Sequence, residues 1–236
     1  MDILKSGAQK LGINLTSTQL ERFEVYYREL VDWNQRMNLT GITSYEEVQV
    51  IHFLDSLTII QAIDKEQNLA VIDVGTGAGL PGIPLKIVLP DIKLTLLEAT
   101  AKKTRFLSHI VNMIGLDDVQ IVTGRAEEVG HNAEYRERYN LVLSRAVAPL
   151  PALVELTLPL CVVGGNFIAQ KKGDIIREME RARKVVSLMG GIYKEVKSVS
   201  LEESGDRRYL IVIEKLEPSP AEYPRRPGIP AKKPII

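Results

Sequence analysis

This chain of 236 residues has one cysteine, a formal net charge of zero and few long hydrophobic runs. The single cysteine, Cys161, excludes an intramolecular disulfide and a metal site made only of thiolates. It lies in the apolar stretch LPLCVVGG, so we expect a buried structural thiol. Residues 1–11 mix charged and apolar side chains and lack the pattern of a signal peptide. These absences predict a cytoplasmic, reducing location.

The sequence shows neither a net charge nor a candidate membrane-spanning segment. Lys plus Arg and Asp plus Glu each number 30, so no overall field attracts nucleic acid. Any role in binding nucleic acid must therefore rest on local basic clusters. The most apolar region, residues 141–163, is interrupted by Arg145, Glu155 and three prolines, which exclude a transmembrane helix. The length fits one large domain with an accessory element.

Helical signals fill residues 1–66, which we expect to form an N-terminal helical segment. Thr16 and Gln19 fit a capping box, and apolar residues then recur at steps of three and four. Ser44 and Glu47 fit a second capping box. Between them, RMNLTGIT predicts a break whose polar side chains bond to nearby backbone.

Residues 67–216 alternate between short apolar strands and helices, which predicts a parallel, doubly wound sheet. The last two predicted strands, 191–199 and 208–215, are joined by a link too short for a crossover helix. We therefore expect an antiparallel hairpin at the sheet edge. The fold class is α/β and Rossmann-like, with a mostly parallel seven-stranded sheet and an antiparallel last strand. Residues 217–236, rich in proline and basic side chains, predict an extended tail rather than a packed element.

The stretch VIDVGTGAGLPGIPL passes from a strand into a glycine-dense turn. It departs from the dinucleotide fingerprint because Leu80 occupies the third glycine position. Asp73 would oppose a pyrophosphate but would attract the ammonium and sulfonium of S-adenosylmethionine. Glu98, at the end of the next strand, suits a ribose diol. With Gly75, Gly77 and the terminal hairpin, these residues favour a class I methyltransferase that binds S-adenosylmethionine.

The atom that accepts the methyl group is less clearly indicated. Pyrimidine carbons usually need a cysteine, and adenine amines an Asn/Asp-Pro-Pro-aromatic motif where this chain has SRAVAP. N7 of guanine has an in-plane lone pair and needs no deprotonation, so it is compatible with the absence of an obvious general base. Other easy nucleophiles are compatible too. A small-molecule or protein methyltransferase, and a non-catalytic nucleotide-binding module or a dehydrogenase, stay open as alternatives.

Six motifs resemble the RsmG (GidB) family and follow the family order over almost the whole chain. They are WNQRMNLTGIT, HFLDS, DVGTGAGLPGIPL, LLEATAKKTRFL, SRAVA and YPRRPGIPAKKPI. The resemblance implies a helical segment on a methyltransferase domain with S-adenosylmethionine as cofactor. It also implies N7 of a guanine in 16S (small-subunit) ribosomal RNA as the target, with that RNA or the small ribosomal subunit as partner.

The resemblance assigns cofactor and catalytic positions. Gly75 and Leu80 would line the cofactor loop, and Ala126 and Glu127 would contact the adenine region. Arg145 would lie beside both the cofactor and the target base, which makes it the candidate catalytic residue. Glu98 stands where family members often have Asp.

The expected substrate-binding residues come from several segments. Lys171 stands at a family lysine, but the extra Lys172 leaves open which of the two faces the site. An extended basic tail suits a phosphate backbone, although a solubilising tail is the alternative. The full set is Asn38, Asp55, Lys171, Arg225 and Arg226.

Structural roles are open for two of these substrate-binding candidates. Asn38 could simply cap a turn, and Asp55 could make a structural hydrogen bond together with His52. His52 and Asp55 share a helix face, but no further metal ligands are spaced nearby, so we expect no metal site. We also expect no membrane partner and a monomer.

Overall fold

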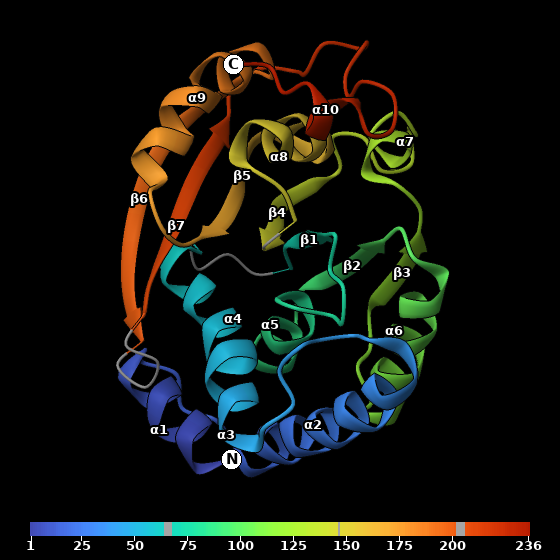
Figure 1. The fold of residues 1–236 in the computed structure, drawn as a ribbon, viewed down its shortest axis with the longest axis vertical. Coiled ribbons are helices and arrows are strands. Elements are labelled where there is room, and N and C mark those ends of the chain that lie inside the picture. The colour runs from blue at the N-terminus through green and yellow to red at the C-terminus, as the bar shows by residue number, and fades with distance from the viewer. Residues whose placement is uncertain (64–67, 146, 202–205) are drawn as a thin grey trace.

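A seven-stranded sheet forms the middle of the molecule (Figure 1). The computed structural model describes residues 1–63, 68–145, 147–201 and 206–236. Neighbouring strands from β1 to β5 are parallel, and β7 lies antiparallel between β5 and β6. The predicted fold class, including the terminal antiparallel hairpin, is confirmed. The order across the sheet is β3 (Val119–Thr123), β2 (Lys93–Glu98), β1 (Ala70–Val74), β4 (Tyr139–Arg145), β5 (Cys161–Lys171), β7 (Asp206–Lys215) and β6 (Gly191–Leu201).

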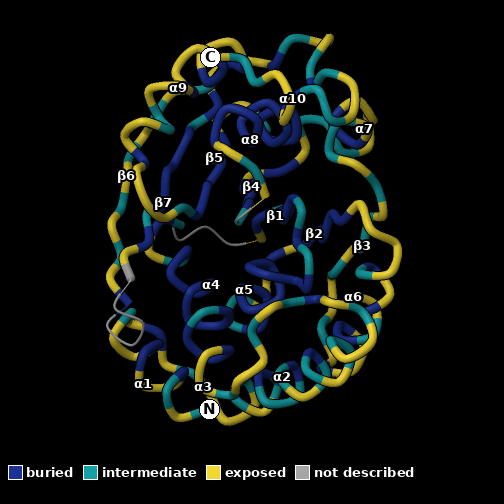
Figure 2. Tube along the Cα trace, viewed as in Figure 1, coloured by how far each residue is buried: buried dark blue, intermediate teal, exposed yellow. Residues whose placement is uncertain are grey.

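Helices cover both faces of the sheet, and successive strand residues alternate between two hydrophobic cores. Val71 and Leu141 pack in one core, and Ile72 and Val142 pack in the other. Figure 2 shows the central strands buried between exposed outer segments. The first core is covered by α1 (Asp2–Lys10), α2 (Ser17–Met37), α5 (Gly82–Val88) and α6 (Ala101–Met113). The second is covered by α8 (Leu150–Thr157) and α9 (Ile175–Leu188).

The N-terminal helices pack directly on the sheet. The predicted capping box at Thr16 is present, with Gln19 N donating to Thr16 Oγ1 at 3.2 Å and Thr16 N to Gln19 Oε1 at 2.9 Å. Along α2, Phe23, Tyr26 and Leu30 are fully buried in the same core as β1 and β2. The predicted division at residue 66 lies outside the described residues, but the segments on its two sides share one core, and the domain boundaries stay a prediction.

Short helical segments complete the chain. The second capping box forms in part, because Ser44 Oγ accepts from Glu47 N at 3.3 Å but itself donates to the Glu47 side chain. A π-helix, Val48–Leu54, then follows where a regular helix was expected. The other short helices are α3 (Tyr45–Glu47), α4 (Asp55–Leu57), α7 (Ala126–Val129), α10 (Ile229–Lys232) and the 3₁₀ turns Thr58–Ala62 and Leu158–Leu160.

The C-terminal tail is packed, so the prediction of an extended, unpacked element is wrong. A single guanidinium, that of Arg136, donates to the tail carbonyls of Ser219, Pro220 and Tyr223 at 2.8–3.1 Å. Prolines lack N–H groups, so a proline-rich segment leaves carbonyls to be satisfied, and a charged donor from the domain satisfies them. The tail turns back over α8 and α7 and ends near α9 (Figure 1).

Arg225 anchors this tail to the domain. Its Nε and NH2 donate to the two oxygens of Glu155 at 2.9 and 2.7 Å, and its backbone N donates to Glu155 Oε1 at 2.8 Å. The Glu155 side chain is fully buried, and such a charge persists only when it is paired. Arg225 therefore points into the fold, whereas Arg226 is exposed.

Other side chains also differ from simple expectation. His109 bonds to Glu29 at 2.5 Å, and the exposed His131 bonds to the carbonyl of Pro224 at 2.6 Å, so both histidines have a partner. Cys161 is buried as expected, and burial raises the pKa of its thiol to about 12.

Candidate functional site

The glycine turn after β1 is held from below by a buried carboxylate. Gly75 and Gly77 have φ of 72° and 61°, which L side chains adopt only with strain. Asp73 Oδ2 accepts from Thr76 Oγ1 at 2.6 Å and from Gly82 N at 2.8 Å. The carboxylate thus ties the turn to the first residue of α5.

Asp73 also has one oxygen to spare. Its Oδ1 is buried and has no hydrogen-bond partner among the described residues. Burial raises the pKa of Asp73 to about 6, against the hydrogen bonds from Thr76 and Gly82, which lower it. An unpartnered buried acceptor costs about 1–3 kcal/mol, so a donor or cation reaching this oxygen would be stabilising. The predicted attraction for a cationic cofactor fits this arrangement and stays a prediction.

Glu98 lies across the turn from Asp73, at the end of β2. Its Oε2 accepts from Gly77 N at 3.1 Å and its Oε1 from Thr100 N at 2.8 Å. A side chain at Gly77 would meet almost nothing, since only Gly75 O lies within reach, at 4.0 Å. The turn therefore presents open backbone beside a fixed carboxylate. This cradle fits the ribose and methionine parts of S-adenosylmethionine.

The remaining cofactor candidates frame the same turn. Leu80 packs its side chain into the core, so only its backbone lies at the turn. Ala126 and Glu127 begin α7 directly after β3, and Glu127 Oε1 accepts from Gly228 N of the tail at 2.8 Å. The tail thus borders the position predicted for the adenine. These assignments stay predictions.

A buried cluster of one carboxylate and two arginines lies at the carboxyl end of β4 and the amino end of the antiparallel strand β7. Asp55 Oδ2 is 2.9 Å from Arg145 NH1, and Asp55 Oδ1 is 2.6 Å from Arg208 Nε. The Asp55 side chain is 6% exposed, so both bonds are largely shielded from water. This geometry favours Asp55 as the residue that positions Arg145. Its predicted contact with substrate is not tested.

The π-helix before Asp55 supplies further partners for Arg145. Arg145 NH1 lies 3.3 Å from the carbonyl of Ile51 and 3.5 Å from that of His52. Ser56 Oγ also donates to the carbonyl of His52 at 2.5 Å. Single π turns shift the backbone out of the regular helical ladder and are frequent at functional sites. Here the shift presents carbonyls to an arginine from a distant strand.

His52 lies in the same cluster and is neutral at neutral pH. Burial, together with the nearby charge of Arg145, lowers the pKa of His52 to about 4. Its Nε2 is 2.7 Å from Thr40 Oγ1, which links it to the NLT segment. Its Nδ1 is buried without a partner among the described residues. Asn38, in that segment, is exposed and has φ of 50°, and its RNA-facing role stays a prediction.

A cavity of about 400 Å³ opens above this cluster. Lys171 is turned away from solvent, with Nζ 2.7 Å from Ala148 O and 3.1 Å from Glu178 Oε2, while Lys172 is exposed. Lys172 is therefore the more solvent-accessible of the two lysines, and which of them faces the substrate stays open. The cavity is lined by Ile51, His52, Asp55, Arg145, Gln170, Lys171, Lys172, Glu178 and Arg208.

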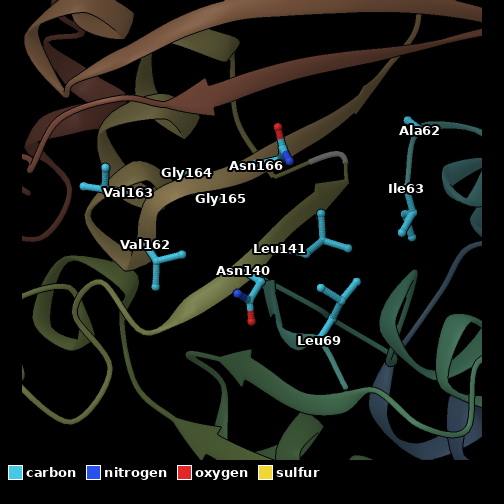
Figure 3. Close-up of a pocket in the computed structure, with 10 residues that line it drawn as sticks. All are labelled: Ala62, Ile63, Leu69, Asn140, Leu141, Val162, Val163, Gly164, Gly165 and Asn166. Carbon is cyan, nitrogen blue, oxygen red and sulfur yellow. The ribbon is translucent and has the colours of Figure 1, made fainter. Parts of the chain in front are cut away.

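The opposite end of the sheet has a smaller hollow without these features. Figure 3 shows it at the amino ends of β4 and β5, where Asn140 and Asn166 are its polar side chains. Its volume is about 180 Å³, and none of its lining residues is charged. Ligands of open α/β sheets bind outside the carboxyl ends of the strands, which is where the larger cavity lies.

The described part of the chain shows neither a metal-binding cluster nor a membrane-spanning helix. It holds no group of three or more His, Cys, Asp or Glu side chains placed to bind a metal. Nor is any described helix both long and apolar enough to cross a membrane.

The fold and the site together define the class of the protein. A sheet of this order, with a glycine turn after β1 and an acid ending β2, is that of a Rossmann-like class I methyltransferase. Solved structures of this fold include M. jannaschii TYW2 in complex with AdoMet, with a TM-score of 0.55, 16% identity and coverage of 75% of this chain and 80% of that one. A mutant of MtNAS in complex with S-adenosylmethionine has a TM-score of 0.56, 13% identity and coverage of 91% and 77%.

The family follows from sequence similarity. Residues 19–209 match the family model described as GidB, rRNA small subunit methyltransferase G. The chain is 54% identical to ribosomal RNA small subunit methyltransferase G of Dehalococcoides mccartyi (strain CBDB1) over 100% of both chains. It is 46% identical to the protein of that name in Alkaliphilus metalliredigens, over 99% of this chain and 98% of the other. The chain belongs to the rRNA small subunit methyltransferase G family, which confirms the predicted resemblance and a methyltransferase activity.

Proposed function

We propose that this protein transfers the methyl group of S-adenosylmethionine to N7 of a guanine in 16S ribosomal RNA. The relatives named above are small-subunit rRNA methyltransferases, which supports this substrate class. The glycine-turn side of the crevice takes the cofactor. The cavity beside Arg145 takes the target base.

The cofactor residues act by holding and orienting. Glu98 accepts hydrogen bonds from the ribose hydroxyl groups of the cofactor. Asp73 Oδ1 lies beneath the glycine turn, where its charge would stabilise the methionine ammonium group. S-adenosylmethionine would supply an electrophilic methyl group, which the nucleophile attacks in line with S-adenosylhomocysteine as the leaving group. The enzyme's contribution to such a displacement is mainly proximity and orientation.

One observation carries the choice of N7. In the described part of the chain, both carboxylates that line the cavity are paired: Asp55 with two arginines, and Glu178 with Lys171. Neither carboxylate is free to remove a proton, and His52, whose pKa is lowered to about 4 by burial and by the charge of Arg145, is a weak base. Guanine N7 has a lone pair in the ring plane and loses no proton when it is methylated, so it needs no such base.

Contacts with RNA come from exposed positions in three segments of the chain. Lys172, Asn38 and Arg226 are exposed and suit a phosphate backbone, whereas Arg225 is occupied by Glu155 and serves the fold. With zero net charge, binding to isolated RNA should be weak, which favours an assembled small subunit as substrate. A cytoplasmic location and a monomeric state go with this proposal.

The test uses the purified protein with methyl-labelled S-adenosylmethionine. Small-subunit particles from cells that lack this methyltransferase are expected to gain label in 16S rRNA, recovered as 7-methylguanosine after nuclease digestion. Arg36→Gln, an exposed residue on α2, should label equally well. Label in protein or in small molecules but never in RNA would contradict the proposal.

A further inference from the structure

The cavity must distinguish guanine from adenine, because methyl transfer to N7 does not distinguish the two bases. N7 of adenine has the same in-plane lone pair as N7 of guanine, so methyl transfer alone does not select guanine. The two purines differ at the opposite edge of the six-membered ring. Guanine has N1–H and a 2-amino group there, both donors, whereas adenine has an acceptor at N1 and no 2-amino group. A hydrogen-bond acceptor in the cavity wall would separate them.

Gln170 supplies such an acceptor with a fixed direction. Its Nε2 donates to the carbonyl of Asp55 at 2.6 Å and to Thr58 Oγ1 at 3.1 Å. Thr58 Oγ1 gives its own proton to the same carbonyl, at 2.7 Å, so it can only accept from Gln170. Turning the amide over would place its oxygen against two acceptors. The amide is therefore held with Oε1 on the other side.

That oxygen has no partner in the described protein. Gln170 is 4% exposed, and its Oε1 is buried and unbonded among the described residues. The cavity lining has two further polar atoms without a hydrogen-bond partner among the described residues, His52 Nδ1 and Glu178 Oε2, and the second is ion-paired with Lys171. Gln170 Oε1 and His52 Nδ1 are both shielded from bulk water. Unmade hydrogen bonds of this kind are costly, and they point to a ligand that completes them.

Gln170 also lies at a suitable distance from the cofactor side. It pairs with Arg145 across β4 and β5, and β4 pairs with β1, which leads into the glycine turn. Two strand spacings separate Gln170 from β1, or about 10 Å. A purine with N7 toward the turn and its six-membered ring toward β5 would span this interval.

We infer that Gln170 selects guanine over adenine by accepting, through Oε1, a hydrogen bond from the base edge that carries N1–H and the 2-amino group. Arg145 complements it as the donor to O6, since its Nε and NH2 make no hydrogen bond to another described residue. Adenine would place its N1 lone pair against Oε1 and its amine against a cation. This inference rests on the proposed function and deepens it.

The test compares guanine and adenine at the methylated position. Small-subunit particles are prepared with either base there, and kcat/KM is measured for the wild type and for Gln170→Met, which keeps the volume and removes the acceptor. A site that accepts a hydrogen bond from a donor on the base strongly rejects a base without that donor. We therefore expect kcat/KM of the wild type to be at least about a hundredfold higher for guanine than for adenine. In Gln170→Met that ratio should fall at least about tenfold. The dissociation constant for S-adenosylhomocysteine should stay within about twofold, because Gln170 lies away from the glycine turn.

Controls separate recognition from folding and from the proposed function. Gln120→Met makes the same change at an exposed position of β3 and should leave the ratio unaltered. Gln170→Asn keeps an amide but withdraws its oxygen, and should also lower the ratio if the methionine variant does not fold. An unchanged guanine-to-adenine ratio in a folded Gln170 variant would overturn the inference. Absence of 7-methylguanosine with the wild type would instead overturn the proposed function.

Discussion

The two halves of the crevice are built from contacts of different range. The glycine-loop half (Asp73 to Gly82 with Glu98) is joined by side-chain hydrogen bonds between residues 2 to 21 positions apart. The arginine half (Asp55, Arg145, Gln170 and Arg208) is joined by bonds between residues 90 to 153 positions apart. The first half is therefore written into one stretch of sequence. The second exists only once the N-terminal helices and the last strands meet.

The charges of the two halves differ as well. The glycine-loop half leaves a buried carboxylate oxygen unpartnered and so suits a cation. The arginine half neutralises the Asp55 carboxylate with two guanidinium groups, and it leaves Nδ1 of a neutral histidine and an amide oxygen without a partner among the described residues. That combination suits an uncharged base with hydrogen-bonding edges. The difference matches a division between cofactor and target.

The largest effect should follow from removing the shared carboxylate of the arginine half. Asp55→Ala leaves the largely buried Arg145 and Arg208 without this partner, which should lower the free energy of unfolding by about 3–5 kcal/mol. Asp32→Ala breaks an exposed pair with Arg36 on α2 and should cost less than about 1 kcal/mol. Urea denaturation of both variants measures this. Similar losses for the two would contradict the central place of Asp55.

A second long-range anchor, outside the crevice, tests whether range alone sets the energy. Arg225→Ala leaves the buried Glu155 without its guanidinium, and we expect a loss of about 3 kcal/mol. Arg226→Ala, at the exposed neighbour, should change stability by less than about 0.5 kcal/mol. Thermal and urea unfolding compare the pair. Equal and small changes in the free energy of unfolding for the two variants would contradict an anchoring role of Arg225 and would favour a solubilising tail.

The glycine-loop half should respond in ligand affinity more than in stability. Gly75→Ala forces φ of 72° on a side chain and brings its Cβ to 2.6 Å from Val147 Cγ2. Gly12→Ala meets the same strain, at φ of 78°, with nothing within 4 Å. Each should cost about 1–2 kcal/mol of stability. Calorimetric titration with S-adenosylhomocysteine should show weaker binding, by about tenfold or more, for Gly75→Ala alone. Equal affinities in the two variants would place the cofactor elsewhere.

The smallest net effect is expected from acid, because the two halves respond with opposite signs. The pKa of His52 is lowered to about 4, so stability is lost as pH falls from about 6.5 to 4, where only the unfolded state is protonated. The pKa of Asp73 is raised to about 6, so stability is gained as pH falls from about 6 to 4. Relative to the wild type, His52→Gln should gain stability over this range and Asp73→Asn should lose it. Urea unfolding at pH 7, 6, 5 and 4 measures both, and shifts of the same sign would refute the assignment.

Sequence reasoning reached the fold and the glycine-loop half because their signals are local. The alternation of strands and helices can be recognised within short segments. The residues of the glycine turn, together with Asp73 and Glu98, are joined to one another by side-chain hydrogen bonds between residues at most 21 positions apart. Resemblance to a family added Arg145 and Lys171. Arg208 and Gln170 were missed, since nothing near either residue in sequence names its partner. The one available hint was their position at the ends of strands expected to be neighbours.

The C-terminal tail also shows that a local sequence pattern does not reveal partners far away in the sequence. Its composition predicts an extended segment, but the donors that pack it lie on Arg136, 83 to 87 residues earlier. Likewise, the side chain of Arg225 looks free in sequence and is fixed in the structure by Glu155. A basic residue in a tail indicates an RNA-binding surface only when it does not form an ion pair with a buried carboxylate.

A crystal structure of the protein with S-adenosylhomocysteine tests the division of the crevice most directly. We predict the ribose hydroxyls on Glu98, the ammonium above Asp73, and the cavity formed by Arg145, Gln170 and His52 left free for the target base. S-adenosylhomocysteine seated in that cavity, with the glycine turn untouched, would contradict the account.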